Sequence, residues 1–246
     1  MQTDIPIIIY THSSYKDVFD ISIKRYEKYA KNYKKIIISD YLMDLNSKII
    51  PLDNSYQSIL YENIDVYSKR LYNTLKQIEN NHEYIIFTHE NNTLFDFINT
   101  ELIIKNVDYM REYNIDQLRL YKGGVDENCN YIKICENIYE IPTQNSYIYT
   151  VQPTIWKLST LIKIMNENNY DYRNIELNID PYMLQYKNCF FYNNEDTFIG
   201  TSRCKSSIFP IIHTTCNGLW LYHENRNYID DLFSEYNIDP NIRGII

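Results

Sequence analysis

The chain has 246 residues, 44% of them hydrophobic, and a formal net charge of −8. This length suggests one large domain or two small ones, and the apolar fraction is enough to bury a core. The longest apolar runs, residues 7–9 and 36–38, are far below the ~20 residues of a membrane span, and residues 1–4 do not resemble a signal peptide. An acidic chain without a Lys/Arg block is also a poor nucleic-acid binder. We therefore expect a soluble cytoplasmic protein, not secreted, with no membrane span and no nucleic-acid partner.

Several common site types are missing from the sequence. The five cysteines are an odd number without a CxxC pair, which indicates reduced thiols rather than a disulfide framework or a zinc cage. There are only 5 glycines, and neither a Walker A loop nor a GxGxxG motif is present. HExxH and GxSxG are absent as well. These absences exclude most NAD enzymes, P-loop ATPases and common hydrolases.

In chain order, the first half alternates strands and helices. We predict strands at 5–10, 35–39, 83–88 and 117–121, separated by helices at 19–33, 64–78 and 94–113. This alternation predicts an α/β fold with a mostly parallel central sheet and helices on both faces. The second half is less regular, with predicted strands at 131–135, 146–150 and 208–213 and helices at 156–168 and 228–236. We expect a single domain, 1–246, made of a nucleotide-binding half (about 1–125) and an α+β half (about 126–246).

Polar clusters follow the predicted parallel strands, at residues 11–14, at Asp40 and at residues 89–92. In open α/β sheets, ligands bind beyond the carboxyl ends of the strands. Glu90 and Asn92 stand two residues apart, so in an extended stretch both would point to the same side and could reach one hard cation that bridges two phosphates. The alternative is a polar turn that simply ends a strand.

Five segments, in their order along the chain, carry a resemblance to a known family. They are Thr11-His12-Ser13-Ser14, the pair Tyr67 and Arg70, His89-Glu90-Asn91-Asn92, the segment 151–156 (VQPTIW) and the segment 213–220 (HTTCNGLW). Together they resemble GT-A-type glycosyltransferases, especially the small sugar transferase domains of large algal and amoebal DNA viruses. The resemblance implies a GT-A-like fold and a hexosyl- or deoxyhexosyltransferase of glycan biosynthesis, acting in the host cytoplasm. Its donor would be a nucleoside-diphosphate sugar, expected to be UDP-linked, and its acceptor a hydroxyl of a glycan or glycoprotein.

The resemblance also implies roles for individual residues. The donor would be bound by Thr11, His12, Ser13, Ser14, Asp40, Tyr67, Arg70, Gln152 and Trp156. Mn²⁺ or Mg²⁺ would be held by Glu90, Asn92 and His213, although Glu-x-Asn stands here in place of the family's Asp-x-Asp. The lost charge should weaken cation binding, so metal dependence stays open. Trp156 and His213 could equally be core residues.

Glu176 matches a late carboxylate that serves inverting relatives as the general base, and we expect inversion here. The alternative is a solvated residue near a helix N-terminus, where the dipole favours an acid. Asp171 and Asp180 are the competing carboxylates. Two other functional classes remain open: a catalytically inactive nucleotide-sugar- or glycan-binding domain, and a tyrosine-rich structural or host-interaction protein.

Overall fold

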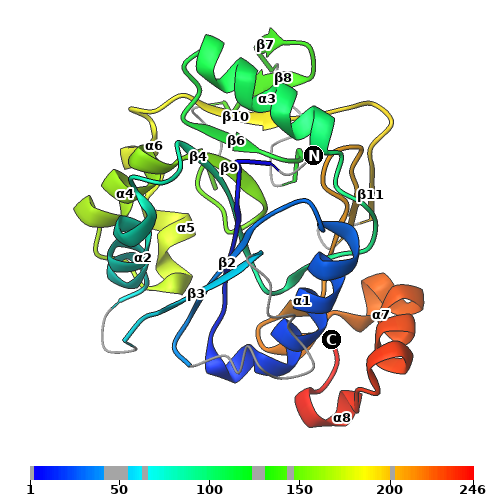
Figure 1. Cartoon of the computed structure of the whole chain (residues 1–246). Coiled ribbons are helices and arrows are strands. Elements are labelled where there is room, and N and C mark those ends of the chain that lie inside the picture. Colours follow the sequence, from blue (N-terminus) through cyan, green and yellow to red (C-terminus); the bar gives the residue numbers. More distant parts are fainter. Residues whose placement is uncertain (1–2, 42–54, 63–65, 124–130, 143–146, 200–202) are drawn as a thin grey trace.

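A computed structural model describes residues 3–41, 55–62, 66–123, 131–142, 147–199 and 203–246. In this part of the chain the central sheet has nine strands, in the order β3-β2-β1-β4-β9-β6-β10-β8-β7 (Figure 1). The strands are β1 (Ile7–Tyr10), β2 (Lys35–Ser39), β3 (Tyr56–Leu60), β4 (Tyr84–His89), β6 (Gln117–Arg119), β7 (Lys133–Cys135), β8 (Ile138–Glu140), β9 (Thr154–Lys157) and β10 (Asn188–Phe191).

Most of these strands run in one direction. Strands β3, β2, β1 and β4 pair in parallel. Strand β9 is antiparallel to both β4 and β6, and β10 is parallel to β6. Strand β8 is antiparallel to both β10 and β7. Within the described residues only β9 and β8 therefore oppose the common direction, and the predicted mostly parallel α/β sheet is confirmed. The sheet includes strands from both halves of the chain.

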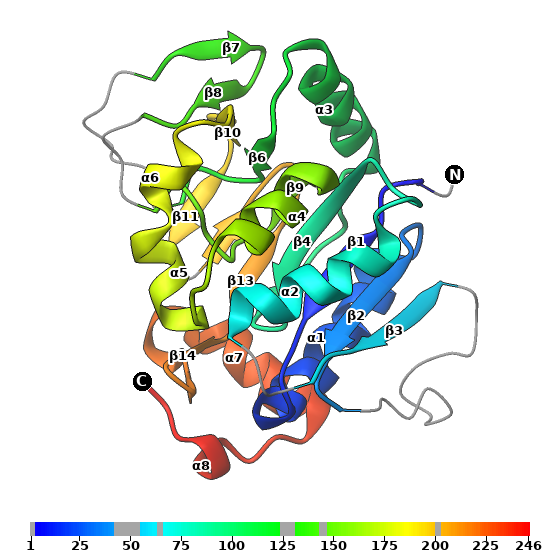
Figure 2. The ribbon, with the colours of Figure 1, turned by 90° about the vertical axis from the view of Figure 1, so that its left-hand side faces the viewer.

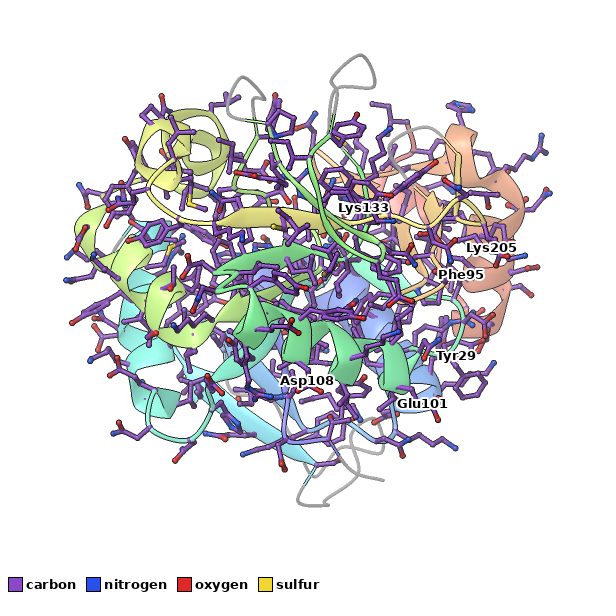
Figure 3. All side chains as sticks on the ribbon, turned by 90° about the horizontal axis from the view of Figure 1, so that it is seen from above. Tyr29, Phe95, Glu101, Asp108, Lys133 and Lys205 are labelled. Carbon is purple, nitrogen blue, oxygen red and sulfur yellow. The ribbon has the colours of Figure 1, made fainter. Side chains whose placement is uncertain are left out.

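Helices cover both faces of the sheet (Figures 1 and 2). Side chains of β1 alternate between the two faces, as the strand pleat requires: Ile7 and Ile9 pack with α1 (Lys16–Tyr29) and α3 (Thr100–Glu112) in one core. Ile8 belongs to the other core, with the opposite helices. These are α2 (Tyr67–Leu75), extended by η2 (Lys76–Ile78), and α4 (Leu158–Glu167), α5 (Tyr172–Asn178) and α6 (Asp180–Met183). Figure 3 shows Glu101 and Asp108 along α3, where both are exposed.

A further group of strands and helices packs on the outer side of α1, beside the end of β4. It contains β5 (Asn92–Leu94), β11 (Thr197–Ile199), β12 (Arg203–Lys205), β13 (Ile211–His213), β14 (Thr215–Cys216), β15 (Leu219–Trp220), α7 (Tyr222–Tyr236) and α8 (Pro240–Arg243). Val18 and Ile21 of α1 share a core with Trp220 and with Ile229 of α7. Because β13 pairs with β5, this group joins the sheet next to residues 90 and 91. No helix in the described ranges is long and apolar enough to cross a membrane.

Several predicted boundaries are wrong. The helix expected over 94–113 begins only at Thr100, because Asn99 caps it by accepting a 3.1 Å hydrogen bond from the Leu102 N–H, and residues 92–94 form β5 instead. The helix expected from residue 156 begins at Leu158, and Trp156 lies in β9 opposite Ile85 of β4.

Other predictions in the second half shift by a few residues. Residues 148 and 149 form bends where a strand over 146–150 was predicted. Residues 63–65 and 143–146 lie outside the described residues. The late strand covers 211–213 rather than 208–213, and the helix predicted over 228–236 already begins at Tyr222.

Candidate functional site

The predicted donor residues that follow β1 and β2 lie together at the carboxyl edge of the sheet. Tyr10 at the end of β1 is in register with Ile38 of β2 and with His89 of β4. The backbone continues this alignment beyond the strands, since the Thr11 N–H donates to the Ile38 carbonyl at 2.9 Å and the Glu90 N–H donates to the Tyr10 carbonyl at 3.2 Å. The segments that follow β1, β2 and β4 therefore lie side by side.

Asp40 fixes the turn that follows β1. Its carboxylate accepts hydrogen bonds from the Ser13 backbone N–H at 2.7 Å and from the Ser13 hydroxyl at 2.8 Å, and it lies 3.1 Å from His12 Nε2. The Ser14 N–H donates to His12 Nδ1 at 3.1 Å, so the imidazole proton belongs on Nε2, where it faces Asp40. The structure thus brings His12, Ser13, Ser14 and Asp40 together, with Asp40 shaping η1 (Ser13–Tyr15).

Arg243 of α8 holds the other side of this turn. Its guanidinium donates to both carboxylate oxygens of Asp17, and to the carbonyls of Ser14 and Gly218 at 3.0 Å each. It also lies 4.8 Å from the ring centroid of Tyr15. Arg243 was not predicted from the sequence, because its contact with Ser14 spans 229 residues and no local sequence pattern indicates it.

Arg70 faces the same turn from α2. Its guanidinium carbon lies 5.1 Å from the ring centroid of Tyr61, and the Tyr61 hydroxyl donates to the Thr11 carbonyl at 3.0 Å. Tyr61 in turn stacks on Tyr10, with ring centroids 5.2 Å apart and an interplanar angle of 3°. Burial raises the pKa of Tyr10 to about 12, while the hydrogen bond with Tyr61 and the positive charge of Arg70 lower it. Arg70 is therefore linked to the Thr11 turn through Tyr61.

Tyr67, the other predicted residue of α2, is fully buried. Its hydroxyl lies 2.7 Å from His89 Nε2, and burial lowers the pKa of His89 to about 3. His89 is therefore neutral at ordinary pH. Tyr67 supports the floor of the site and is covered by other rings, instead of meeting solvent directly.

Glu90 and Asn91 form the turn between β4 and β5. Glu90 and Asn92 therefore do not share the extended stretch that the sequence suggested. Glu90 is buried, and the loss of solvation raises its pKa to about 8, although the charge of Arg243 opposes this. The Asn92 amide donates to the Val151 carbonyl at 3.3 Å, and Asn91 Nδ2 lies 2.7 Å from His213 Nε2.

Binding of a divalent cation at this turn would depend on the side-chain oxygens of Glu90, Asn91 and Asn92. The described residues contain no group of three His, Cys, Asp or Glu side chains placed to hold a metal. However, the side-chain oxygens of Asn91 and Asn92 are buried and have no hydrogen-bond partner within the described part of the chain. Together with the Glu90 carboxyl they offer the hard oxygen donors that Mg²⁺ and Mn²⁺ prefer. His213 Nε2 is already engaged by Asn91, which makes it a weaker candidate.

Glu176, the predicted base, lies on α5 and is half-buried. Its Oε1 accepts a hydrogen bond of 2.8 Å from the Val151 N–H. Since the Val151 carbonyl accepts from the Asn92 amide, the backbone of one residue, Val151, connects Glu176 to the strand-end cluster. The competing Asp171 caps α5 by accepting from the Asn174 N–H at 3.0 Å, which is a structural role. Asp180 is the first residue of α6.

The two remaining predicted donor residues differ in position. Gln152 lies in the loop before β9 and is half-buried. Trp156 is fully buried in the core, where its ring centroid lies 5.8 Å from that of Tyr149. Of the two interpretations that the sequence allowed for Trp156, the structure places it in the core.

No family model and no curated protein matches this chain. Among solved structures it is similar to a cytidylyltransferase from Leptospira borgpetersenii (16% identity, 79% of this chain and 77% of that chain, TM-score 0.46). It is also similar to a UDP-glucose pyrophosphorylase complexed with UDP-glucose (9% identity, 95% and 99%, TM-score 0.49). A third is the mannosyltransferase PcManGT from Pyrobaculum calidifontis in complex with GDP-Man and Mn²⁺ (9% identity, 97% and 65%, TM-score 0.47). Function is therefore inferred from the site itself.

Proposed function

We propose that this protein is a glycosyltransferase that moves a sugar from a nucleoside-diphosphate sugar, expected to be UDP-linked, to an acceptor hydroxyl of a glycan or glycoprotein, with inversion. One observation carries the proposal: the backbone N–H and carbonyl of Val151 join Glu176 to Asn92, so a half-buried carboxylate lies near the residues where a diphosphate is expected.

The leaving diphosphate needs stabilisation of its negative charge. Arg70 would supply a positive charge from α2, which its contact with Tyr61 supports, and the turn after β1 would supply polar groups held by Asp40. A divalent cation, when bound, would neutralise phosphate charge, and Glu90, Asn91 and Asn92 would hold it. A single protein carboxylate in this set is consistent with weak cation affinity.

Glu176 would act as the general base. The acceptor oxygen forms a bond to the anomeric carbon, the bond from that carbon to the diphosphate oxygen breaks, and its electron pair leaves with the diphosphate. The acceptor proton passes to the Glu176 carboxylate, which the Val151 N–H orients. Inversion is preferred because Glu176 offers a base, whereas Glu90 is assigned to holding the cation.

A non-catalytic nucleotide-sugar-binding domain is the second candidate. It is favoured by Asn92, since an amide that donates to the Val151 carbonyl replaces the second carboxylate of the metal motif. The two candidates differ in turnover: an enzyme releases nucleoside diphosphate from a bound donor, even slowly, and a binding domain does not.

Donor binding is tested by thermal shift over nucleoside diphosphates and their sugars, with and without Mn²⁺. A ligand at 100 times its dissociation constant stabilises the folded state by ~2.7 kcal/mol, which is readily measured. The proposal expects one nucleotide base to dominate, and stabilisation by the diphosphate to exceed that by the nucleoside. If no nucleotide or nucleotide sugar shifts the unfolding temperature, both candidates fail.

A further inference from the structure

Tyr172 presents a partly exposed aromatic ring next to the candidate base. It is the first residue of α5 and is 42% exposed. Its ring stacks on His89 at 5.3 Å with an interplanar angle of 28°, and it meets the ring of Tyr67 edge-on at 5.5 Å. Because His89 and Tyr67 are both buried, the part of the Tyr172 ring that packs on them is covered, while the residue as a whole stays exposed.

The rings beneath Tyr172 form a fixed support. His89 Nε2 lies 2.7 Å from the Tyr67 hydroxyl, and the ring of Tyr10 lies 5.0 Å from His89 and 5.1 Å from Tyr67. These side chains come from the ends of β1 and β4 and from α2, so three elements of the scaffold hold them. An aromatic side chain supported in this way loses little conformational entropy when a ligand packs on it.

Two acidic side chains stand near this ring. Glu176 follows four residues later on α5 and therefore lies on the same helix face. Burial of its hydroxyl end raises the pKa of Tyr172, and the charges of Glu90 and Glu176 raise it further, although the residue as a whole is partly exposed. The surroundings of Tyr172 therefore combine an apolar ring face with hydrogen-bond acceptors.

We propose that the exposed face of Tyr172 is the subsite for the sugar ring of the acceptor, so that the acceptor is a carbohydrate hydroxyl rather than a peptide or lipid hydroxyl. A pyranose has an apolar C–H face that packs on an aromatic ring, and hydroxyls at its edge that donate to carboxylates. With its C–H face on Tyr172, the ring would hold a hydroxyl at Glu176. This inference rests on the proposed function and narrows its acceptor from a glycan or glycoprotein hydroxyl to a sugar hydroxyl.

Direct binding tests the subsite without turnover. Saturation-transfer NMR with methyl glycosides of glucose, galactose, mannose and rhamnose should detect binding to the wild-type protein saturated with nucleoside diphosphate. Tyr172→Ala should weaken the best glycoside by ~10-fold, and Tyr172→Phe should stay within about 2-fold of wild type, because the ring is kept. Phe97→Ala is the matched control: Phe97 is an exposed aromatic that packs on Tyr29 at 5.2 Å, on the opposite end of α1 from the site.

Steady-state kinetics then distinguish an effect of the substitution on acceptor binding from an effect on donor binding. Tyr172→Ala should raise KM for the glycoside acceptor and leave nucleoside-diphosphate affinity unchanged. The subsite is rejected if no methyl glycoside binds the wild-type protein, if Tyr172→Ala binds glycosides as tightly as wild type, or if the variant affects only the donor. If the wild-type protein binds both the glycoside and the nucleotide but transfers no sugar, the catalytic proposal fails and the subsite stands. The two failures are therefore distinguishable.

Discussion

Glu176 accepts a hydrogen bond of 2.8 Å from the backbone N–H of Val151, which lies in the loop before β9. The carbonyl of the same residue accepts from the side-chain amide of Asn92, the first residue of β5. Helix α5 is thereby tied to the segment that follows β4, and the candidate base is oriented by the backbone. The arrangement permits a clean test, because glutamine can accept the same hydrogen bond without the charge.

Glu176→Gln should lower the transfer rate by ~10²–10⁴-fold, the usual contribution of a general base, and leave donor affinity nearly unchanged. Product formation gives the rate and calorimetry gives the affinity. Asp171→Ala is the comparison: it removes the α5 cap, so it should cost about 1 kcal/mol of stability with a far smaller loss of rate. Wild-type turnover in Glu176→Gln would show that the base is elsewhere.

Arg70→Ala should weaken binding of nucleoside diphosphate more than binding of the nucleoside, because a guanidinium pairs with phosphate oxygens. We expect a loss of ~10-fold or more for the diphosphate, measured by calorimetry on both ligands. Lys69→Ala, one residue earlier on α2, is the control, since Lys69 lies by Tyr72 instead of Tyr61. Equal effects of Arg70→Ala on the two ligands would show that Arg70 has a packing role and does not bind the phosphates.

Arg243→Gln should loosen the turn after β1, because it removes the ion pair with Asp17 and the hydrogen bonds to Ser14 and Gly218. The expected result is a loss of about 1–3 kcal/mol in the free energy of unfolding together with weaker nucleotide binding. Urea denaturation measures the first and thermal shift the second. Arg226→Gln, which removes an exposed pair with Asp230, should change neither. Unchanged nucleotide affinity in Arg243→Gln would show that the contacts of Arg243 do not contribute to nucleotide binding.

His89 and Glu90 predict opposite pH dependences of stability. The pKa of His89 falls from 6.5 to about 3, so below pH 6.5 the unfolded chain binds a proton that the folded chain does not, and stability drops as the solution becomes more acidic. The pKa of Glu90 rises from 4.5 to about 8, so between these values the folded chain keeps a proton that the unfolded chain loses, and stability drops as the pH rises.

These two contributions place their combined optimum between pH 4.5 and 6.5. Urea denaturation of the protein in EDTA across pH 4–9 should show this optimum. Glu90→Gln should flatten the decline on the alkaline side and keep the acidic one. If the alkaline decline is the same in Glu90→Gln, then Glu90 is not the group that titrates there.

The central strands were predictable because continuous apolar runs encode strands buried on both faces. β2 spans the predicted residues 35–39, and β1 and β4 differ by only one or two residues at their ends. β9 was missed because its four residues run directly into the periodic helix α4, so the combined segment has helical periodicity. Tertiary pairing with β4 and β6 decides between the two conformations.

The site was predictable only where it follows strand ends. Residues 11–14, Asp40 and Glu90 could be placed together because parallel strands end at one edge. Contacts made by helices and late segments could not: Val151 joins Glu176 through its backbone, and Arg243 reaches Ser14 from the far end of the sequence. Tyr172 could not be singled out among the 26 tyrosines of the sequence, because its distinguishing feature, the stacking on His89, is visible only in the structure.

The most direct test of the central claim is ³¹P NMR of the purified protein with the nucleotide sugar that stabilises it most and a methyl glycoside acceptor. The account predicts release of nucleoside diphosphate together with a glycosylated product, and loss of both in Glu176→Gln. Cleavage of the diphosphate bond itself, with release of sugar phosphate, would contradict it. So would binding of the donor without any release of nucleoside diphosphate over days.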